Sequence, residues 1–373
     1  MKKLLLPILI VIICLSCSTQ SNESEQGEFD FSYSIDTVMI DPGEGFLYLR
    51  SGLSLAALSP EKGQLYNYNP DASEIEVIDL DQLKLTRRIK MEKEGPQGTG
   101  NPSSLTISPD GRFFFATYTD IREFNTQLDS MKQYKINGKK FEVLNSDETI
   151  NSPFVLSPDG KFALVNYGSI EYFEVRSGIS ALNLADFKLK KFPLELFERS
   201  DPYHISYSED GQIRLKTIES MHIDPIDHRV LISSHNFNEA YLLDLISDSL
   251  TKKVFESKLT QNIKQIPARS TANSREEFHK LWNGTKDYVE FGRFYYDDYN
   301  EKFWRFSQDL DRKIGDSAVY RQITTIFDKN LNQLHEEVIP IPYYGFKFFK
   351  DGKLYSYVNV EDELGFAVFT FDF

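Results

Sequence analysis

The chain has 373 residues, of which 40% are hydrophobic, 14% aromatic and 26% charged, and its formal net charge is −14. This apolar content supports one large or two ordinary folded domains and excludes a disordered or collagen-like chain. The acidity argues against a general nucleic-acid-binding protein, whose surface needs clustered Lys and Arg. Twenty Tyr and 29 Phe against two Trp favour a protein built from sheets.

The N-terminus carries a targeting signal. Two lysines precede an almost purely apolar run at residues 4–15, and because a membrane span needs about 20 apolar residues, the run predicts a signal peptide. Both cysteines of the chain, Cys14 and Cys17, fall here, which excludes a disulfide framework in the mature protein. The segment from Cys14 to Cys17 resembles the lipobox of bacterial lipoproteins. That resemblance implies a signal peptide over residues 1–16, cleavage after Ser16 and acylation of Cys17, for example with palmitate.

Residues 17–28 predict a flexible tether. The segment is polar after Cys17, contains no aliphatic residue and carries Glu23, Glu25 and Glu28. Acidic residues after the lipid-bearing cysteine resemble the surface-export signals of Bacteroidota lipoproteins. We therefore expect an outer-membrane lipoprotein of the cell envelope, on its periplasmic side or at the cell surface, that contacts the membrane through its lipid anchor.

Residues 29–373 predict one all-β domain with an internal repeat. Residues 77–89 align without gaps to residues 242–254, and residues 181–189 are a weaker copy; each copy predicts strand, tight turn, strand. The offsets are whole multiples of a unit of about 52–55 residues, which is typical of propeller repeats.

Turn signals of Pro, Asp and Gly give the same period. They precede aromatic or aliphatic strands such as 46–49, 113–118 and 162–167. The six signals are Asp41–Gly43, Ser108–Gly111, Ser157–Gly160, Asp224–Pro225, Asp297–Asp298 and Lys350–Gly352. One signal per unit predicts a six-bladed β-propeller, or a seven-bladed one if Ser208–Gly211 marks a blade of its own.

Two further features complete the predicted architecture. The alternating run 29–40 and the C-terminal run 366–373 are both β-like, and their pairing would close the ring without a free edge. Ser274–Glu277 is a capping-box pattern followed by apolar residues at helical spacing, which predicts a short helical insertion over residues 274–283.

Several stretches together resemble a family of Bacteroidota lipoproteins with a domain of unknown function (DUF4221), related to TolB-like six-bladed propellers. The residues that carry the resemblance are the lipobox at Cys17, Lys93–Gly98 and Phe291–Phe306. The resemblance implies the propeller fold and the envelope location. The family has no established reaction, so it implies no catalytic residue.

The sequence shows no catalytic constellation, metal site or cofactor motif. It lacks the serine-hydrolase elbow, the zinc-binding helix and the phosphate-binding loop. Four of the six histidines lie between His204 and His235, and their spacing could place two on one rim, but catalytic zinc needs about three converging ligands and His228 lies in a turn. We therefore predict no catalytic residue, no metal and no cofactor.

A ligand-binding rim is the best functional prediction. Its candidate residues are exposed aromatics and polar residues near strand ends, namely Tyr343, Tyr344, His235, Asn166 and Arg305. Short Asp-Ser/Thr-aliphatic patterns, like those that Bacteroidota glycosylate, mark Thr37, Ser130, Ser249 and Ser317 as possible O-glycosylation sites.

Three functions remain open at this point. The leading one is a non-enzymatic propeller whose face or central funnel binds a ligand, an envelope protein or a glycan, and not nucleic acid. An alternative is an envelope enzyme acting on glycans or peptides through residues in the funnel. The third is a structural subunit of a larger envelope assembly.

Overall fold

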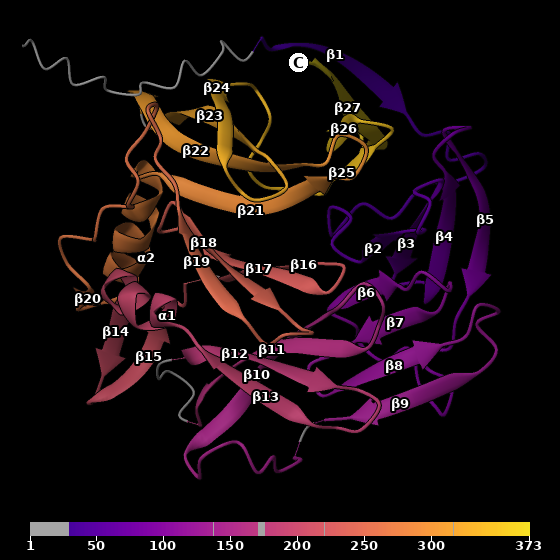
Figure 1. Ribbon diagram of the computed structural model, residues 1–373, viewed down its shortest axis with the longest axis horizontal. Helices are drawn as coiled ribbons and strands as arrows, with labels where there is room; N and C mark the ends of the chain where they lie inside the picture. The colour runs from indigo at the N-terminus through magenta and orange to yellow at the C-terminus, as the bar shows by residue number, and fades with distance from the viewer. Residues whose placement is uncertain (1–29, 137, 171–175, 220, 316) are drawn as a thin grey trace, which may run out of the picture.

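A computed structural model describes residues 30–136, 138–170, 176–219, 221–315 and 317–373. The predicted signal peptide, the tether, Ser16 and Cys17 lie outside the described residues. Within the described part, the chain forms six four-stranded antiparallel sheets arranged in a ring, and one three-stranded sheet beside them (Figure 1). The predicted all-β propeller fold is therefore confirmed.

Each of the first three sheets is a simple meander, with strands in chain order. The first sheet contains β2 (Ala56–Leu58), β3 (Gln64–Asn69), β4 (Glu74–Asp79) and β5 (Lys84–Lys90). The second contains β6 (Ser104–Ile107), β7 (Phe113–Ala116), β8 (Asp120–Phe124) and β9 (Met131–Lys135). The third contains β10 (Glu148–Leu156), β11 (Phe162–Ser169), β12 (Arg176–Asn183) and β13 (Leu189–Pro193).

The next two sheets follow the same order. One contains β16 (Met221–Ile226), β17 (Arg229–Ser234), β18 (Glu239–Asp244) and β19 (Leu250–Val254). The other contains β21 (Glu290–Asp297), β22 (Lys302–Ile314), β23 (Ser317–Phe327) and β24 (Gln333–Val338). The two long copies of the sequence repeat are thus β4–β5 and β18–β19, and the weaker copy is β12–β13: each is the outer hairpin of a sheet.

The last sheet joins the two ends of the folded chain. It contains β25 (Lys347–Lys350), β26 (Lys353–Val360), β27 (Glu363–Asp372) and, as its outer strand, β1 (Ser32–Met39). β1 pairs antiparallel with β27 along its whole length, from Ser32 opposite Asp372 to Met39 opposite Gly365. The predicted closure of the ring by the first and last strands is confirmed.

The hydrophobic core lies between neighbouring sheets. The side chains of Tyr68 and Phe115, for example, pack edge to face between the first two sheets, with ring centroids 5.2 Å apart. Clusters of this kind fill the interface between every pair of neighbouring four-stranded sheets. One of them joins the last sheet to the first, and it includes Ile40, Leu65 and Phe366.

Four of the six predicted turn signals connect the first and second strands of a sheet, whereas Asp224–Pro225 lies within β16 and the turn of that hairpin follows at 227–228. In the turn at Ser157–Gly160, the Ser157 hydroxyl accepts a hydrogen bond from the Phe162 backbone amide at 2.9 Å. Gly160 has a positive φ of +67°, and a Cβ there would meet the Phe114 ring of the neighbouring sheet at 2.4 Å. The turn therefore requires glycine for its conformation and for its packing.

The signal at Asp41–Gly43 is an exception, and the strand predicted at 46–49 does not form. This segment links the closing strand β1 to the first sheet, and it turns through hydrogen bonds such as Gly52 N to Leu49 O. The turn of the first sheet is instead at 59–63, where the Ser59 hydroxyl accepts from Gln64 N. Phe46 is left 81% exposed because no sheet covers it.

The connections divide between two faces of the ring because adjacent strands are antiparallel. Turns between strands one and two, and between three and four, lie on one face; the remaining connections lie on the opposite face. Two of these are long, and they flank the β16–β19 sheet. The first holds α1 (Glu195–Ser200), η1 (Asp201–Tyr203), β14 (Ser206–Glu209) and β15 (Gln212–Lys216). The second holds β20 (Thr271–Ala272), α2 (Arg275–Gly284) and η2 (Thr285–Asp287).

The two long connections fold together into a cap. β14 pairs with β15 and, in parallel, with β20, which gives the three-stranded sheet. Ile205, Ala272 and Phe278 form the buried core of the cap. Residues 208–211 thus belong to a hairpin of the cap, and α1 is a helix that the sequence did not predict.

The predicted helical insertion is confirmed as α2. The Ser274 hydroxyl accepts a hydrogen bond from Glu277 N at 3.1 Å, and the Glu277 carboxylate accepts from Asn273 N at 2.7 Å. These bonds satisfy amide groups that a helix start leaves unpaired. No helix in the described part of the chain is long and apolar enough to cross a membrane.

Ring closure should contribute strongly to stability. Phe366 is fully buried between the last sheet and the first, so Phe366→Ala is expected to lower the free energy of unfolding by about 3–5 kcal/mol. The control is Phe46→Ala, which removes an exposed ring and should change that free energy by less than about 0.5 kcal/mol. Denaturant unfolding followed by circular dichroism measures both. Equal effects of the two substitutions would contradict the closure.

Candidate functional site

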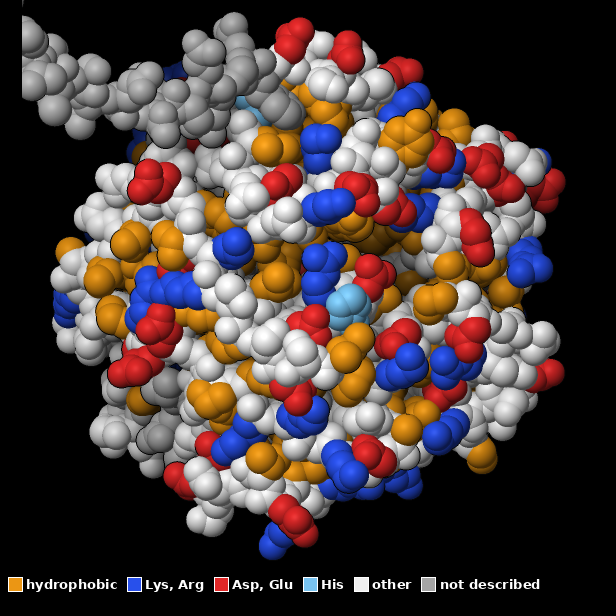
Figure 2. Space-filling view, in the orientation of Figure 1, with side chains coloured by type: hydrophobic (Ala, Val, Ile, Leu, Met, Phe, Trp, Pro, Cys, Tyr) orange, Lys and Arg blue, Asp and Glu red, His pale blue; other side chains and the backbone are white. Residues whose placement is uncertain are grey.

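A cavity of about 860 Å³ lies between the cap and the ring. The cap contributes β15, the segment after it, α2 and η2, whereas the ring contributes the start of β21, the facing parts of β22 and β23, and the loop before β25. The cavity therefore opens on the face that carries the long connections. Figure 2 shows acidic and basic side chains interspersed over the face in view, with hydrophobic side chains at the surface around α2.

Aromatic side chains form the walls of the cavity. Trp282, on α2, is 45% exposed, and its ring lies 6.4 Å from that of the buried Phe278 one turn earlier on the same side of the helix. Tyr344, in the loop before β25, is 71% exposed, and its ring lies perpendicular to that of Tyr343 at 5.5 Å. Exposed aromatic rings on both sides of a cavity provide flat apolar surfaces for a ligand.

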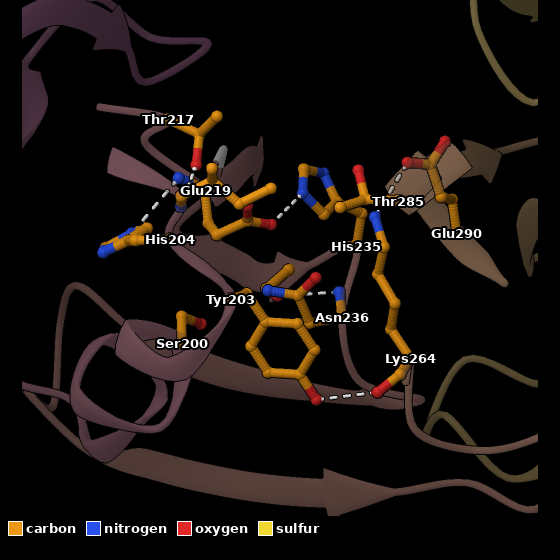
Figure 3. A network of polar contacts seen from close by, with 12 residues as sticks. Ser200, Tyr203, His204, Thr217, Glu219, His235, Asn236, Lys264, Thr285 and Glu290 are labelled. Atoms are coloured by element: carbon orange, nitrogen blue, oxygen red, sulfur yellow. Dashed lines mark hydrogen bonds and ion pairs between the residues drawn. The ribbon is translucent and has the colours of Figure 1, made fainter. Parts of the chain in front are cut away.

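One part of the floor is a histidine–glutamate pair. Glu219, after the cap hairpin, and His235, after β17, are joined by a 2.5 Å contact between Oε2 and Nε2 (Figure 3). Burial raises the pKa of Glu219, but the hydrogen bond and charge of His235 and the charge of Lys264 outweigh it and lower that pKa below its usual value. Glu219 is therefore ionised at neutral pH and orients the imidazole.

An ion pair between Lys264 and Glu290 completes the floor. The Lys264 ammonium donates to Glu290 Oε1 at 2.9 Å, and the Tyr343 hydroxyl donates to Glu290 Oε2 at 2.8 Å. Gln308 also donates to Glu290, at 3.1 Å. Burial raises the pKa of Glu290, yet Lys264 and Tyr343 outweigh it, so the pKa is lowered and the carboxylate stays charged.

The surroundings of the two pairs keep the floor electrically balanced. Lys264 is only 5% exposed at its side chain, and Glu290 12%. Burial and the charge of Arg293 lower the pKa of the neighbouring His222 to about 3, so this imidazole is neutral at physiological pH. On the floor, Lys264 and Glu290 therefore neutralise each other, and the carboxylate of Glu219 is held by its hydrogen bond to His235.

The structure brings three of the five predicted rim residues together. His235, Tyr343 and Tyr344 all line the same cavity. Asn166 lies on β11 opposite Asn151, is 6% exposed, and is absent from the cavity lining.

Arg305 is fully buried beside the cavity. Its guanidinium donates to the backbone carbonyls of Gly292, Ser234 and Phe237 at 2.8–3.3 Å, and it lies 4.9 Å from the ring centres of Phe291 and Phe294. Burial lowers its pKa to about 9, which still leaves it charged at neutral pH. The hydrogen bonds of Arg305 thus connect β22 to the end of β17, and they position the loop that carries His235.

The four predicted O-glycosylation residues are all exposed. Thr37 lies within β1, Ser130 precedes β9, Ser249 precedes β19, and Ser317 is the first residue of β23. Glycosylation at these four residues stays a prediction: Thr37 lies in the β1–β27 ladder, and the Ser249 hydroxyl forms a 2.9 Å hydrogen bond with that of Ser247.

The sequence analysis missed Glu219, Lys264, Glu290 and Trp282. Each comes from a different connection or strand start, and no spacing in the chain relates them. Trp282 alone carried a signal, because a tryptophan on the boundary of an amphipathic helix is often half exposed. Among the described residues, no group of three or more His, Cys, Asp or Glu side chains is arranged to hold a metal ion.

The Lys264–Glu290 pair should be important for folding because both groups are largely buried. Lys264→Met is expected to lower the free energy of unfolding by about 3–5 kcal/mol, since it leaves a buried carboxylate without its cation. Adding Glu290→Gln should recover part of that loss.

The control for this pair is the exposed pair of Arg50 and Asp71, whose side chains are 80% and 61% exposed. Arg50→Met should change the free energy of unfolding by less than about 1 kcal/mol. Denaturant titration at neutral pH measures all four proteins. A double variant less stable than Lys264→Met would show that the two groups do not compensate each other.

Solved structures of other proteins share this architecture. No curated protein matches the sequence. A solved DUF4221 family member from Bacteroides vulgatus superimposes with a TM-score of 0.66 at 14% identity, covering 92% of this chain and 98% of that one. The structure of an exported protein from Bacteroides fragilis superimposes with a TM-score of 0.52 at 10% identity, covering 91% of this chain and 95% of that one. The family model described as "Domain of unknown function (DUF4221)" matches residues 28–338, and the chain belongs to this family.

Proposed function

We propose that the protein is a binding module that holds a carbohydrate segment in the cavity between the cap and the ring. The observation that carries this proposal is the combination of exposed aromatic walls, at Trp282 and Tyr344, with a floor whose two carboxylates are held by partners within the protein. Sugars present apolar C–H faces and hydroxyl edges, so they need flat rings and hydrogen-bonding groups rather than net charge.

Two amide side chains of the floor use only one of their two polar atoms in hydrogen bonds within the protein. Gln308 uses its amide nitrogen on Glu290, and Gln322 uses its amide oxygen to accept from Tyr343 N at 3.0 Å. Within the part of the chain that the structure describes, Gln308 Oε1 and Gln322 Nε2 form no hydrogen bond, so both are available to a hydroxyl group. Because Glu219 and Glu290 stay ionised, their remaining lone pairs are also acceptors for sugar hydroxyls.

Tryptophan fluorescence can test the binding directly. The chain has two tryptophans, and Trp304 is fully buried whereas Trp282 lines the cavity. Titration with a panel of soluble oligosaccharides is expected to change the emission of Trp282, and Trp282→Phe should remove that change. Tyr344→Ala should weaken binding at least tenfold in calorimetry, through loss of a stacking surface.

Tyr299→Ala is the matched control for Tyr344→Ala. Tyr299 is 73% exposed but lies in the turn between β21 and β22, on the opposite face of the ring. Its substitution should leave the affinity unchanged. If no oligosaccharide in the panel binds, or if both tyrosine variants bind equally well, the carbohydrate proposal is wrong.

An enzymatic role is the second candidate, and the Glu219–His235 pair favours it. A histidine oriented by a carboxylate is the arrangement of a general base, and this one borders a cavity large enough for a glycan or peptide. In that case His235→Gln would abolish product formation, detected by mass spectrometry, while the affinity for the substrate persisted. A pure binding module would release no product in either form.

We also propose that Cys17 anchors the protein to the outer membrane. This rests on the lipobox resemblance and on the apolar run of residues 4–15, because two or more acyl chains give stable membrane attachment. Expressed in a Bacteroidota host, the protein should incorporate labelled palmitate and sediment with outer membranes. Cys17→Ala should abolish both, whereas Cys14→Ala should abolish neither. Sedimentation of the Cys17→Ala protein with membranes would refute the anchor.

A further inference from the structure

A second cavity, of about 340 Å³, borders the centre of the ring. It is lined by the first strands of three sheets, β16, β21 and β25, with the loop before β25, and by Lys62 from the turn between β2 and β3. These three strands border the middle of the ring in Figure 1. Every lining residue belongs to the described part of the chain, and the cavity shares no residue with the one beneath the cap.

Lys347, the first residue of β25, lines this cavity with a nearly buried amine. The residue is 6% exposed, and its Nζ lies 5.8 Å from the centre of the Tyr295 ring and 5.7 Å from that of Phe306. The amine donates to the backbone carbonyls of Tyr344 and Gly345. A neutral amine has two N–H groups, which serve both carbonyls and leave the nitrogen lone pair for another atom.

The surroundings of Lys347 favour its neutral form. Within the part of the chain that the structure describes, no carboxylate forms an ion pair with this amine, and the charge that acts on it is the guanidinium of Arg293. Burial, and then the positive charge of Arg293, lower the pKa of Lys347 to about 7. A large share of the molecules therefore carries a free amine at neutral pH, and the free amine is the nucleophilic form of lysine.

The carboxylates around the cavity are bound to other cations. Arg293 donates through Nε and Nη2 to Asp224 Oδ1, on β16. Lys62 pairs with Asp298 at 2.6 Å. Because each of these carboxylates is held by a different cation, neither draws a proton onto Lys347.

A phenol stands beside the amine. The Tyr295 hydroxyl donates to Gly345 O at 3.4 Å, and Lys347 Nζ donates to the same oxygen at 3.4 Å, so one carbonyl brings the two groups together. Burial raises the pKa of Tyr295 to about 12, and the phenol therefore keeps its proton at neutral pH. Since its hydrogen bond is long, the hydroxyl can turn to a stronger acceptor at little cost.

We propose that this cavity captures a small aldehyde or ketone as an imine on Lys347, with the Tyr295 hydroxyl as the proton donor to the carbonyl oxygen. Its volume lies near the lower end of the range for ligand pockets, which suits a small compound. The site does not depend on the proposed carbohydrate cavity.

The reaction needs no further reactant. The lone pair of Nζ forms a bond to the carbonyl carbon, and the electrons of the C=O π bond move to the oxygen, which takes the proton of Tyr295. The nitrogen, now positively charged, returns a proton to the phenolate. The hydroxyl group of the adduct then leaves as water with the remaining nitrogen proton as the C=N bond forms. One amine and one carbonyl compound thus give one imine and one water, without oxidation or reduction.

Reductive trapping with glycolaldehyde tests the site. Sodium cyanoborohydride converts an imine into a stable amine, and mass spectrometry of peptides cut by a protease that ignores lysine locates it. At neutral pH we expect Lys347 to be labelled at least tenfold faster than Lys350. Lys350 is the matched control: it lies on the same strand with its side chain 11% exposed, but Asp351 and Asp81 pair with it at 2.7 and 2.8 Å and raise its pKa.

The pH dependence of labelling gives a second readout. Because the neutral amine reacts, labelling of Lys347 should rise through about pH 7 and then level off, whereas that of Lys350 should still increase in strongly alkaline solution. Arg293→Met removes the neighbouring cation and should move the midpoint for Lys347 to higher pH. Tyr295→Phe should slow the labelling severalfold at an unchanged midpoint.

Two controls accompany these variants. Circular dichroism checks that each is folded, and Arg293→Met combined with Asp224→Asn, which leaves no carboxylate without its cation, takes the place of Arg293→Met if that variant unfolds. Without the reductant, the added mass should disappear on dialysis, because water hydrolyses an imine. Labelling of Lys347 no faster than that of Lys350, or a midpoint near the ordinary lysine value of about 10.4, would overturn the proposal.

Discussion

The pairing of β1 with β27 is the constraint on which the rest of the structure depends. It joins the first described strand to the last sheet over eight residue pairs, and it leaves β27 without a free edge. The cluster around Phe366 then packs the last sheet against the first. Because the ring is closed, every sheet has a neighbour on both sides, and the apolar faces of all sheets are buried without a separate covering layer.

Closure also decides where function can be placed. Antiparallel sheets in a ring send alternate connections to opposite faces, and the short turns with Ser-Pro-Asp-Gly leave one face without insertions. The other face receives the two long connections around the β16–β19 sheet. They meet because they flank the same sheet, and the parallel pairing of β14 with β20 joins them into a cap. The larger cavity is lined on one side by this cap and on the other by β21, β22 and β23 of the ring.

The larger cavity combines aromatic walls with a polar floor. The carboxylate of Glu219 is hydrogen-bonded to His235, and that of Glu290 is paired with Lys264. Both carboxylates are therefore held by partners within the protein, which suits a neutral, hydroxyl-rich ligand better than a charged one.

Local signals in the sequence determined the repeating parts of this protein. The outer hairpins β4–β5 and β18–β19 align because each must bury the same alternating face, and α2 begins at Ser274 because its capping contacts lie within four residues. The prediction of a strand at 46–49 was wrong. The composition of this segment is β-like, but it lies between the closing strand β1 and the first sheet, where no neighbouring strand pairs with it. The tertiary structure alone decided the site. Glu219, His235, Lys264 and Glu290 come from connections whose meeting depends on ring closure and on the folding of the cap, and contacts between such distant segments leave no period or spacing in the chain.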